Sequence, residues 1–341
     1  MISKYLAAVV LLLMLFLPNS HATDVYKYTD MEGNVKYSNT PPSHIDEKSP
    51  RDYEVIHGSK RNKVLHDRIG KTVKEGISEF DSADSVCGQS GNNYYIMGIN
   101  KLNQGDFGEA VDFFSMAIDL NPNCAEAYAA RALSRSAQGD YPEAIDDCNH
   151  AIELKPNYAK AYVIRGLTKG KLEDYTGEIR DYDKAIMIEP NNADAHNNKG
   201  AAMVKLRKLR EGIHESNTAI RVKPEFAEAY NNRGIAQVEL GNIEKGIQDY
   251  DKALEIDPNY AEAYNNRGVA RGKLRDYDGE MEDYDAAIEI NPYYAAAYYN
   301  RGMARIRLGE TESGCLDLSK ARELGYVKAD DPISEFCNLE W

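Results

Sequence analysis

The chain has 341 residues, of which 41 are basic and 55 acidic, so its formal net charge is −14 at pH 7. This balance argues against nucleic-acid binding, because a nucleic-acid binder needs a basic face to displace the counterions of the phosphates. The charge favours solubility, but it identifies no partner.

Residues 1–22 have the pattern of a secretory signal peptide. Lys4 gives a short basic start, residues 5–17 are apolar without a break, and Ser20-His21-Ala22 fits a signal-peptidase site. The apolar run is too short to cross a bilayer comfortably as a helix. We therefore predict export to the periplasm, with secretion as the alternative and with no transmembrane segment after cleavage. An uncleaved anchor is the other interpretation of this segment.

Residues 23–44 predict a small β-hairpin domain. β-Prone residues at 26–29 and 35–38 lie on either side of Glu32-Gly33, and Pro41-Pro42 closes the segment. The ordered string of an aromatic pair, Asp-x-x-Gly, a Tyr-Ser step and Pro-Pro resembles a short domain of unknown function, the DUF4124 type. That domain occurs behind the signal peptide of exported proteins of Gram-negative bacteria. The resemblance supports export and implies no activity.

Residues 45–90 are polar and charged and predict a linker. Within them an apolar stripe at helical spacing predicts one amphipathic helix near 61–82. The stripe consists of Leu65, Ile69, Val73, Ile77 and Phe80. We expect this helix to cap the first repeat, and a partner-binding role is the alternative.

A proline returns every 34 residues, at Pro122, Pro156, Pro190, Pro224, Pro258 and Pro292. A fixed period of this length indicates stacked repeats. Counting from Gly91 gives seven units over residues 91–328, with further starts at Ala125, Ala159, Ala193, Ala227, Ala261 and Ala295. Each unit has two apolar-periodic stretches joined by a turn, and in the first six units a proline ends the second stretch.

These units resemble the tetratricopeptide family. Its early aromatic is matched by Tyr128, Tyr162, Tyr230, Tyr264 and Tyr298, and its next small residue by Gly98, Gly166, Gly200, Gly234, Gly268 and Gly302. Its helix-B alanine is matched in every unit, by Ala117, Ala151, Ala185, Ala219, Ala253, Ala287 and Ala321. The resemblance implies an all-α solenoid of seven helix–turn–helix repeats that binds partners in a concave groove lined by the first helices. A capping helix at 329–341, opened by Asp331-Pro332 as N-cap and first turn, is expected to close the stack.

The chain departs from the family pattern at the internal turn, where Glu173, Arg207 and Arg275 replace glycine. Units three and six also share a sequence motif in which Glu178 and Glu280 replace the first helix-B alanine. This shared motif indicates duplication of a three-repeat block.

A basic residue occupies the seventh place of six units, where the family often has an apolar core residue. An acid follows sixteen residues later, which gives the candidate structural ion pairs Arg131–Asp147, Arg165–Asp181, Lys199–Glu215, Arg233–Asp249, Arg267–Asp283 and Arg301–Asp317. The first unit is apolar at both places. We expect each pair to join helices within a unit or between neighbours, because an unpaired buried charge is costly. Solvent-exposed charges are the alternative.

Asparagines recur in the middle of the first helices and suit a groove that holds an extended peptide, because an amide both donates and accepts. The candidate partner-binding residues are Asn197, Asn198, Asn231, Asn232, Asn265, Asn266, Lys171, Lys205, Lys273 and Arg307. The lysines would meet acidic groups of the partner. The alternative is that the asparagines bond only among themselves. A carboxylate clamp of the co-chaperone kind is matched only in part, because one of its asparagine places is apolar here.

Five cysteines remain after export, where disulfides persist. Cys315 and Cys337 form the candidate disulfide, because both fall in the last predicted helices; two buried free thiols are the alternative. No cysteine has zinc-site spacing, so we predict no metal.

Catalytic motifs are missing from the sequence, which predicts no catalytic residue, no cofactor and no enzyme activity. The sequence favours a protein-interaction scaffold of the cell envelope, with partners that are periplasmic or associated with the outer membrane. A holdase-like periplasmic chaperone or secretion factor is the alternative.

Overall fold

The computed structural model describes residues 25–29, 35–38, 53–56 and 86–337 of the chain. It divides into two compact units, Met1–Arg61 and Asn62–Trp341. The predicted signal peptide and the predicted helix near 61–82 lie outside the described residues.

The first unit contains a three-stranded antiparallel sheet in the order β2-β1-β3. The strands are β1 (Val25–Thr29), β2 (Val35–Ser38) and β3 (Tyr53–Ile56). Tyr28 on β1 pairs with Lys36 on one side and with Tyr53 on the other. The strands β1 and β2 occupy the arms of the predicted hairpin, whose turn lies outside the described residues. The strand β3 lies in the segment assigned to the linker on sequence grounds.

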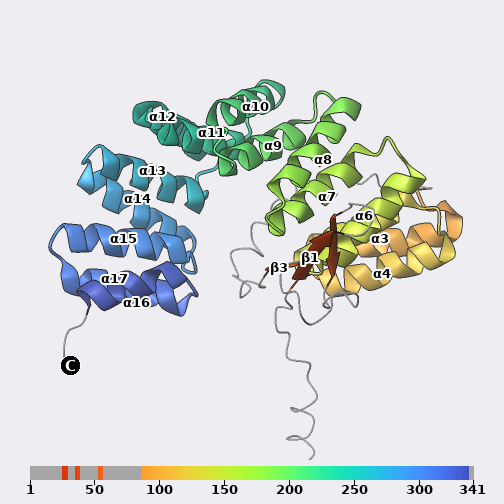
Figure 1. Ribbon diagram of the computed structural model, residues 1–341, viewed down its shortest axis with the longest axis horizontal. Helices are drawn as coiled ribbons and strands as arrows, with labels where there is room; N and C mark the ends of the chain where they lie inside the picture. The colour runs from red at the N-terminus through yellow and green to blue at the C-terminus, as the bar shows by residue number, and fades with distance from the viewer. Residues whose placement is uncertain (1–24, 30–34, 39–52, 57–85, 338–341) are drawn as a thin grey trace, which may run out of the picture. The chain divides into compact units, whose positions relative to one another are not determined.

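The second unit consists of helix pairs that stack in chain order (Figure 1). The first helix of each pair is α3 (Gly88–Gln104), α5 (Ala125–Gln138), α7 (Ala159–Lys171), α9 (Ala193–Lys205), α11 (Ala227–Glu239), α13 (Ala261–Lys273) or α15 (Ala295–Arg307). The second helix is α4 (Phe107–Leu120), α6 (Tyr141–Leu154), α8 (Tyr175–Ile188), α10 (Leu209–Val222), α12 (Ile243–Ile256), α14 (Tyr277–Ile290) or α16 (Thr311–Glu323). We call these helices A and helices B. The predicted unit starts from Ala125 onward are the first residues of helices A.

The recurrent proline explains where helix B ends in the first six repeats. The residue before proline is disfavoured in the helical region, and Asn121, which precedes Pro122, has φ −140° and ψ 87°. Its N–H still donates to the carbonyl of Ala117 at 3.0 Å. The alanine at this place is fully buried in every repeat. A short residue there lets the next helix A pack directly on the end of helix B.

The small residue in the middle of helix A is required by the approach of helix B. A Cβ atom at Gly234 would lie 2.6 Å from the ring of Tyr250. The buried rings of Phe114, Tyr182, Tyr250 and Tyr284 at this helix-B place therefore fill the volume that the glycine leaves empty, and the buried core continues from one repeat to the next.

The turn between helices A and B uses the left-handed backbone region. Gly105, Gly139, Gly241 and Gly309 have positive φ values there. At the three places where the sequence departs from glycine, the left-handed conformation is kept, with φ values of 59°, 63° and 64° at Glu173, Arg207 and Arg275. Side chains with a Cβ atom are strained in this region, so these three turns store strain that the glycine turns avoid.

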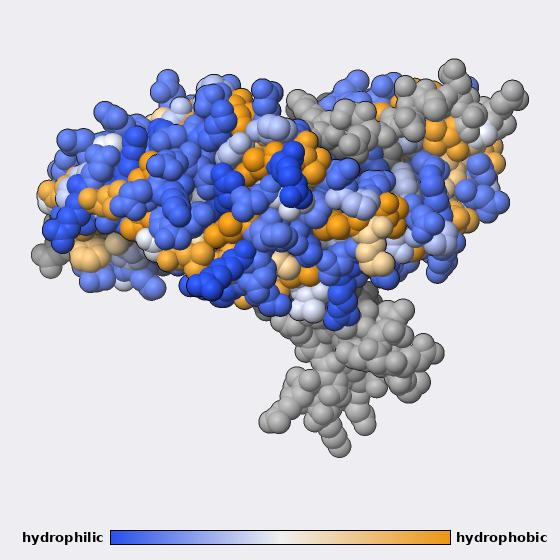
Figure 2. Space-filling view, turned by 90° about the horizontal axis from the view of Figure 1, so that it is seen from above, coloured by the Kyte–Doolittle hydropathy of each residue, from blue (hydrophilic) through white to orange (hydrophobic). Residues whose placement is uncertain are grey.

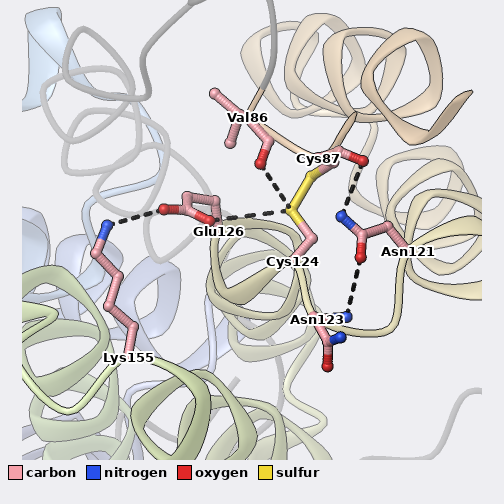
Figure 3. The surroundings of a disulfide bond; sticks show 7 residues. All are labelled: Val86, Cys87, Asn121, Asn123, Cys124, Glu126 and Lys155. Carbon is pink, nitrogen blue, oxygen red and sulfur yellow. Dashed lines mark hydrogen bonds and ion pairs between the residues drawn. A yellow bond between two sulfur atoms is a disulfide. The ribbon is translucent and has the colours of Figure 1, made fainter. Parts of the chain in front are cut away.

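Two disulfides lie at the two ends of the stack. Cys315 on α16 is bonded to Cys337, as the sequence predicts, and Cys87 is bonded to Cys124. The second bond joins the N-cap residues of α3 and α5, and the Asn121 amide donates to the Cys87 carbonyl beside it at 3.0 Å (Figure 3). The remaining thiol, Cys148, is buried. The stacking of the first two repeats brings Cys87 and Cys124 together. The spacing of the cysteines in the sequence does not predict this bond.

The stack ends in a short 3₁₀ turn, Val327–Ala329, followed by α17 (Asp330–Phe336). The prediction of Asp331 as the N-cap is wrong by two residues, because Ala329 is the N-cap and Asp331 lies in the first turn. The 3₁₀ turn starts the helical winding early. Tyr326 ahead of it packs on Tyr299 of the last repeat, with 4.9 Å between ring centroids.

Candidate partner-binding face

The six basic residues at the seventh place all contact the acid sixteen residues later in their own repeat. The closest N–O distances are 2.5–2.8 Å. All six acids on helices B are buried. In five repeats the guanidinium also lies over the tyrosine three residues before it, 5.2–5.5 Å from the ring centroid. The basic side chain therefore packs between its tyrosine and its acid.

Each of these cations also reaches back to helix B of the preceding repeat. Arg233, for example, donates to Asn217 at 2.7 Å as well as to Asp249. The residues contacted in this way recur every 34 residues and are Ser115, Asn149, Asp183, Asn217, Asp251 and Asp285. One side chain thus joins two helices B of neighbouring repeats. The predicted ion pairs therefore lie within a repeat, and the same cations also make contacts between repeats.

Several buried acids hold a second cation. Asp283 lies 3.1 Å from Arg271, one turn after Arg267 on α13. Equivalent contacts exist between Arg135 and Asp147, Lys169 and Asp181, and Arg305 and Asp317. Burial raises the pKa of Asp283, although the hydrogen bonds from Arg267 oppose this change. Two cations on one carboxylate compensate for its loss of water.

The fourth repeat forms the same ion pair between helices A and B with different residues. Lys199 contacts Glu215 at 2.8 Å, and His196, which replaces the usual tyrosine, places Nδ1 2.6 Å from the same carboxylate. The other ring nitrogen of His196 lies 3.1 Å from the Pro190 carbonyl. Burial opposes ionisation of Glu215, but the hydrogen bonds from Lys199 and His196 hold its pKa below the usual value.

The asparagines form a ladder between helices A. The amides of Asn232, Asn266 and Asn300 donate to the side-chain oxygens of Asn197, Asn231 and Asn265 of the preceding repeat, at 2.8, 2.9 and 2.8 Å respectively. Asn197, Asn231 and Asn265 are 6%, 0% and 5% exposed. The expectation that these three contact a partner is wrong, because the neighbouring helix encloses them. The geometry fits the alternative, in which the asparagines bond among themselves.

The other predicted contact residues reach the surface to different degrees. Asn198, Asn232 and Asn266 are half-buried. The amides of Asn232 and Asn266 belong to the ladder, whereas the side-chain oxygen of Asn198 accepts from Asn197 on the same helix at 3.4 Å. Lys171, Lys205, Lys273 and Arg307 are exposed at the last turns of helices A. Arg307 forms an ion pair with Glu280 and stacks on Tyr277 at 5.1 Å. These two contacts bind the Arg307 side chain to residues of its own chain.

Apolar side chains lie one helical turn before these cations. Ile235, Val269 and Met303 are half-buried and precede the cationic place by four residues, so they share its side of helix A. We call Lys171, Lys205, Ile235, Val269, Lys273 and Met303 the helix-A face. In the fifth repeat Glu239 interrupts the cations and pairs with Arg207.

Two buried glutamates stand where the family pattern has alanine, and the sequence predicts no role for them. Glu178 and Glu280 are buried on helices B and accept hydrogen bonds from Tyr182 at 3.0 Å and Tyr284 at 3.2 Å. A Cβ atom at Gly170 would lie 2.6 Å from the Glu178 carboxylate. The sequence motif shared by units three and six could have identified them. In this motif a glycine in helix A accompanies a glutamate in helix B.

The described surface has few other functional candidates. Hydrophilic side chains cover most of the face seen in Figure 2, and apolar side chains are scattered among them. Within the described residues no group of acidic, histidine or cysteine side chains is arranged to hold a metal ion. The described helices include none with the length and apolarity needed to cross a membrane.

Comparison with protein families agrees with this geometry. Tetratricopeptide repeat family models match residues 125–158, 159–192, 227–260 and 249–281. The chain is a tetratricopeptide repeat protein. The family model for a domain of unknown function, DUF4124, matches residues 12–65, a longer segment than the hairpin predicted from the sequence.

Solved tetratricopeptide repeat structures show the same fold. A tetratricopeptide repeat protein from Parabacteroides merdae is similar with a TM-score of 0.60 and 19% identity, over 73% of this chain and 98% of its own. The pilF protein of Pseudomonas aeruginosa is similar with a TM-score of 0.53 and 17% identity, over 62% and 97%. The Cut9–Hcn1 hetero-tetramer of the APC/C is similar with a TM-score of 0.58 and 14% identity, over 71% and 46%. No curated protein sequence matches the chain significantly.

Proposed function

We propose that this tetratricopeptide repeat protein is a scaffold of the cell envelope that holds an extended segment of one partner protein on its helix-A face. The observation that supports this proposal most directly is the spacing of that face. Exposed lysines and half-buried apolar side chains recur at multiples of 34 residues on helices A, and the asparagine ladder links four of these helices, α9, α11, α13 and α15. A fixed surface of this kind suits one partner, because little conformational entropy is lost when it binds.

The chemistry of the helix-A face selects acidic segments. Lys171, Lys205 and Lys273 present ammonium groups on a chain with a net charge of −14. These local cations would meet carboxylates of the partner, while Ile235 and Val269 would contact its apolar side chains. The apolar positions are half-buried, whereas capture of many unfolded chains needs a large exposed apolar surface. This difference favours the scaffold over the holdase.

The experiment is capture of partners from envelope extract with three immobilised proteins. One is the unmodified repeat protein, and one has Lys171→Glu, Lys205→Glu and Lys273→Glu on helices A. The third has the same change of charge on exposed residues of helices B, at Lys184→Glu, Arg221→Glu and Lys245→Glu.

We expect one stoichiometric partner that is lost with the helix-A variant and kept with the helix-B variant. Equal capture by all three proteins would remove the helix-A face from the function. A broad mixture of proteins in low yield would instead support the holdase.

The proposed location follows from the signal peptide prediction at residues 1–22. Mass spectrometry of the protein recovered from a periplasmic fraction should give a mature chain that begins at Thr23. Recovery of the full-length chain from the membrane fraction would contradict this location.

A further inference from the structure

The structure contains two copies of one side-chain cluster, three repeats apart. Each copy has a buried glutamate on helix B, a tyrosine that donates to it, a second tyrosine at the start of the same helix, and a cation from helix A of the next repeat. The copies are Glu178, Tyr182, Tyr175 and Lys205 in the first case and Glu280, Tyr284, Tyr277 and Arg307 in the second. They provide an internal comparison.

The two clusters differ in what the cation does. Arg307 stacks on Tyr277 and at the same time forms an ion pair with the Oε2 atom of Glu280. Lys205 stacks on Tyr175, with Nζ 4.9 Å from the ring centroid. The Oε2 atom of Glu178 is buried and has no hydrogen-bond partner among the described residues. An ammonium is a compact point charge, whereas the planar guanidinium of Arg307 presents a fork of N–H donors that reaches the carboxylate from its place on the ring.

The surroundings of Glu178 decide its charge. Lys171 on α7, Lys205 on α9, Asp174 ahead of α8, and Tyr175 and Tyr182 on α8 face it. Glu178 is only 7% exposed, and burial raises its pKa to about 7, although Lys205, Tyr182 and Lys171 oppose the rise. Both states of this carboxyl group are therefore populated near neutral pH, and an unpartnered ionised oxygen is costly at this depth.

We propose that Glu178 and Lys205 form a pH-controlled latch between repeats three and four. When the carboxyl group is protonated, Lys205 rests on the Tyr175 ring and its ammonium is presented on the helix-A face. When the carboxyl group is ionised, Lys205 leaves the ring and donates to Oε2, in the position that Arg307 takes on Glu280. The second cluster does not switch, because its guanidinium makes both contacts at once.

The latch regulates the surface described under Proposed function and rests on that proposal for its biological role. A closed latch withdraws one of the three lysines that would meet acidic groups of the partner. Partner capture should therefore be stronger below neutral pH than above it. The latch itself is defined within one chain and can be tested without a partner.

The test uses NMR of the full mature protein with lysine labelled at the ε carbon. The Lys205 signals are assigned with a Lys205→Gln variant, and Lys273 serves as an internal control. Protons above an aromatic ring are shifted upfield. We expect the Lys205 ε protons to be upfield at pH 5.5 and to move downfield as the pH rises through about 7, the value at which Glu178 titrates. Burial raises the pKa of Tyr175 above its usual value, so this ring does not titrate in the same window.

Two variants separate the latch from a general effect of pH. In Glu178→Gln, which keeps the shape of the side chain, Lys205 should stay upfield at every pH. In Lys205→Arg, which copies the second cluster, the new side chain should hold one position from pH 5.5 to 8.5. The proposal is overturned if the Lys205 signals do not move in the unmodified protein, or if they move equally in Glu178→Gln. Failure of partner capture would affect the proposed function and leave this result unchanged.

Discussion

Arg233 and Asp249 form a two-point ion pair across helices α11 and α12 of the fifth repeat. The guanidinium Nε lies 3.0 Å from Oδ2, and Nη2 contacts Oδ1. This pair is the simplest example of the ion pair found in six repeats. It has no second cation, because Gln237 stands where other repeats have one. It is therefore the best place to measure what this ion pair contributes to the free energy of unfolding.

Removal of either partner of this pair should destabilise the chain. Arg233→Ala and Asp249→Ala are each expected to lower the free energy of unfolding by about 2–4 kcal/mol, because the first leaves the buried Asp249 carboxylate without its cation and the second removes the charged partner of Arg233. The double variant should lose less than the sum, by about 1–3 kcal/mol. Urea unfolding followed by circular dichroism measures all three. Additive losses would mean that the two side chains do not interact.

The asparagine ladder should contribute to stability and not to binding. Asn231→Ala removes the oxygen that accepts from Asn266 and should cost about 1 kcal/mol, because a half-buried donor loses its partner. Partner capture by the folded variant should be unchanged. A variant that unfolds as the unmodified chain does but no longer captures its partner would return Asn231 to the binding site.

The strained turns offer a stabilising substitution. Arg275 has φ 64° at a place where other repeats have glycine, so Arg275→Gly should raise the free energy of unfolding by about 0.5–1 kcal/mol. The reverse change at an equivalent turn, Gly241→Ala, is the control and should lower it by about 1 kcal/mol. Thermal melts of the two variants should therefore shift in opposite directions. Shifts of the same sign would show that the left-handed backbone does not decide the effect.

Stability should depend on pH through Glu178. The folded chain holds this proton up to about pH 7, whereas the unfolded chain releases it near about pH 4. The contribution of Glu178 is thus complete below about pH 4 and is lost as the pH rises through about 7. Glu178→Gln should be more stable than the unmodified chain by about 1–3 kcal/mol at pH 8 and should lose this part of the pH slope.

The matched control for that measurement is Glu280→Gln. It removes the charge that pairs with Arg307, so it should destabilise the chain at pH 8. The free energy of unfolding, measured in guanidinium chloride at pH 5 and pH 8, distinguishes the two variants. A Glu178→Gln variant that is less stable at pH 8 would contradict the expected sign.

The thiols should react in a fixed order. Burial raises the pKa of Cys148 well above its usual value, so the folded oxidised chain should leave this thiol unmodified by an alkylating reagent. The unfolded oxidised chain should react once, and the unfolded reduced chain five times. Mass spectrometry counts the adducts. More than one adduct without reductant would show that a disulfide is missing.

The sequence predicts the regular part of the stack well, because identical packing forces identical spacing. The alanine that starts each unit from Ala125 onward is the first residue of a helix, and each basic residue at the seventh place meets the acid sixteen residues later. A deviation from a repeated pattern can be read from the chain because seven copies are available for comparison.

Contacts between repeats were harder to predict. Helical periodicity places Asn231 on one side of its helix, but it does not say how closely the next helix A approaches that side. The same limit hid the Cys87–Cys124 bond, since Cys87 precedes the first unit and no second copy exists for comparison. The strand β3 has four residues between charged segments, too few for a periodic signal.

The acceptors that link neighbouring repeats give the stack a direction. Toward the N-terminal end the cations reach neutral groups, Ser115 and Asn149, and a covalent bond spans the first repeat. Toward the C-terminal end they reach the exposed carboxylates of Asp251 and Asp285. Salt screens exposed charges and leaves neutral hydrogen bonds nearly unchanged. A rise in ionic strength will therefore weaken the links at Asp183, Asp251 and Asp285 more than the links at Ser115, Asn149 and Asn217.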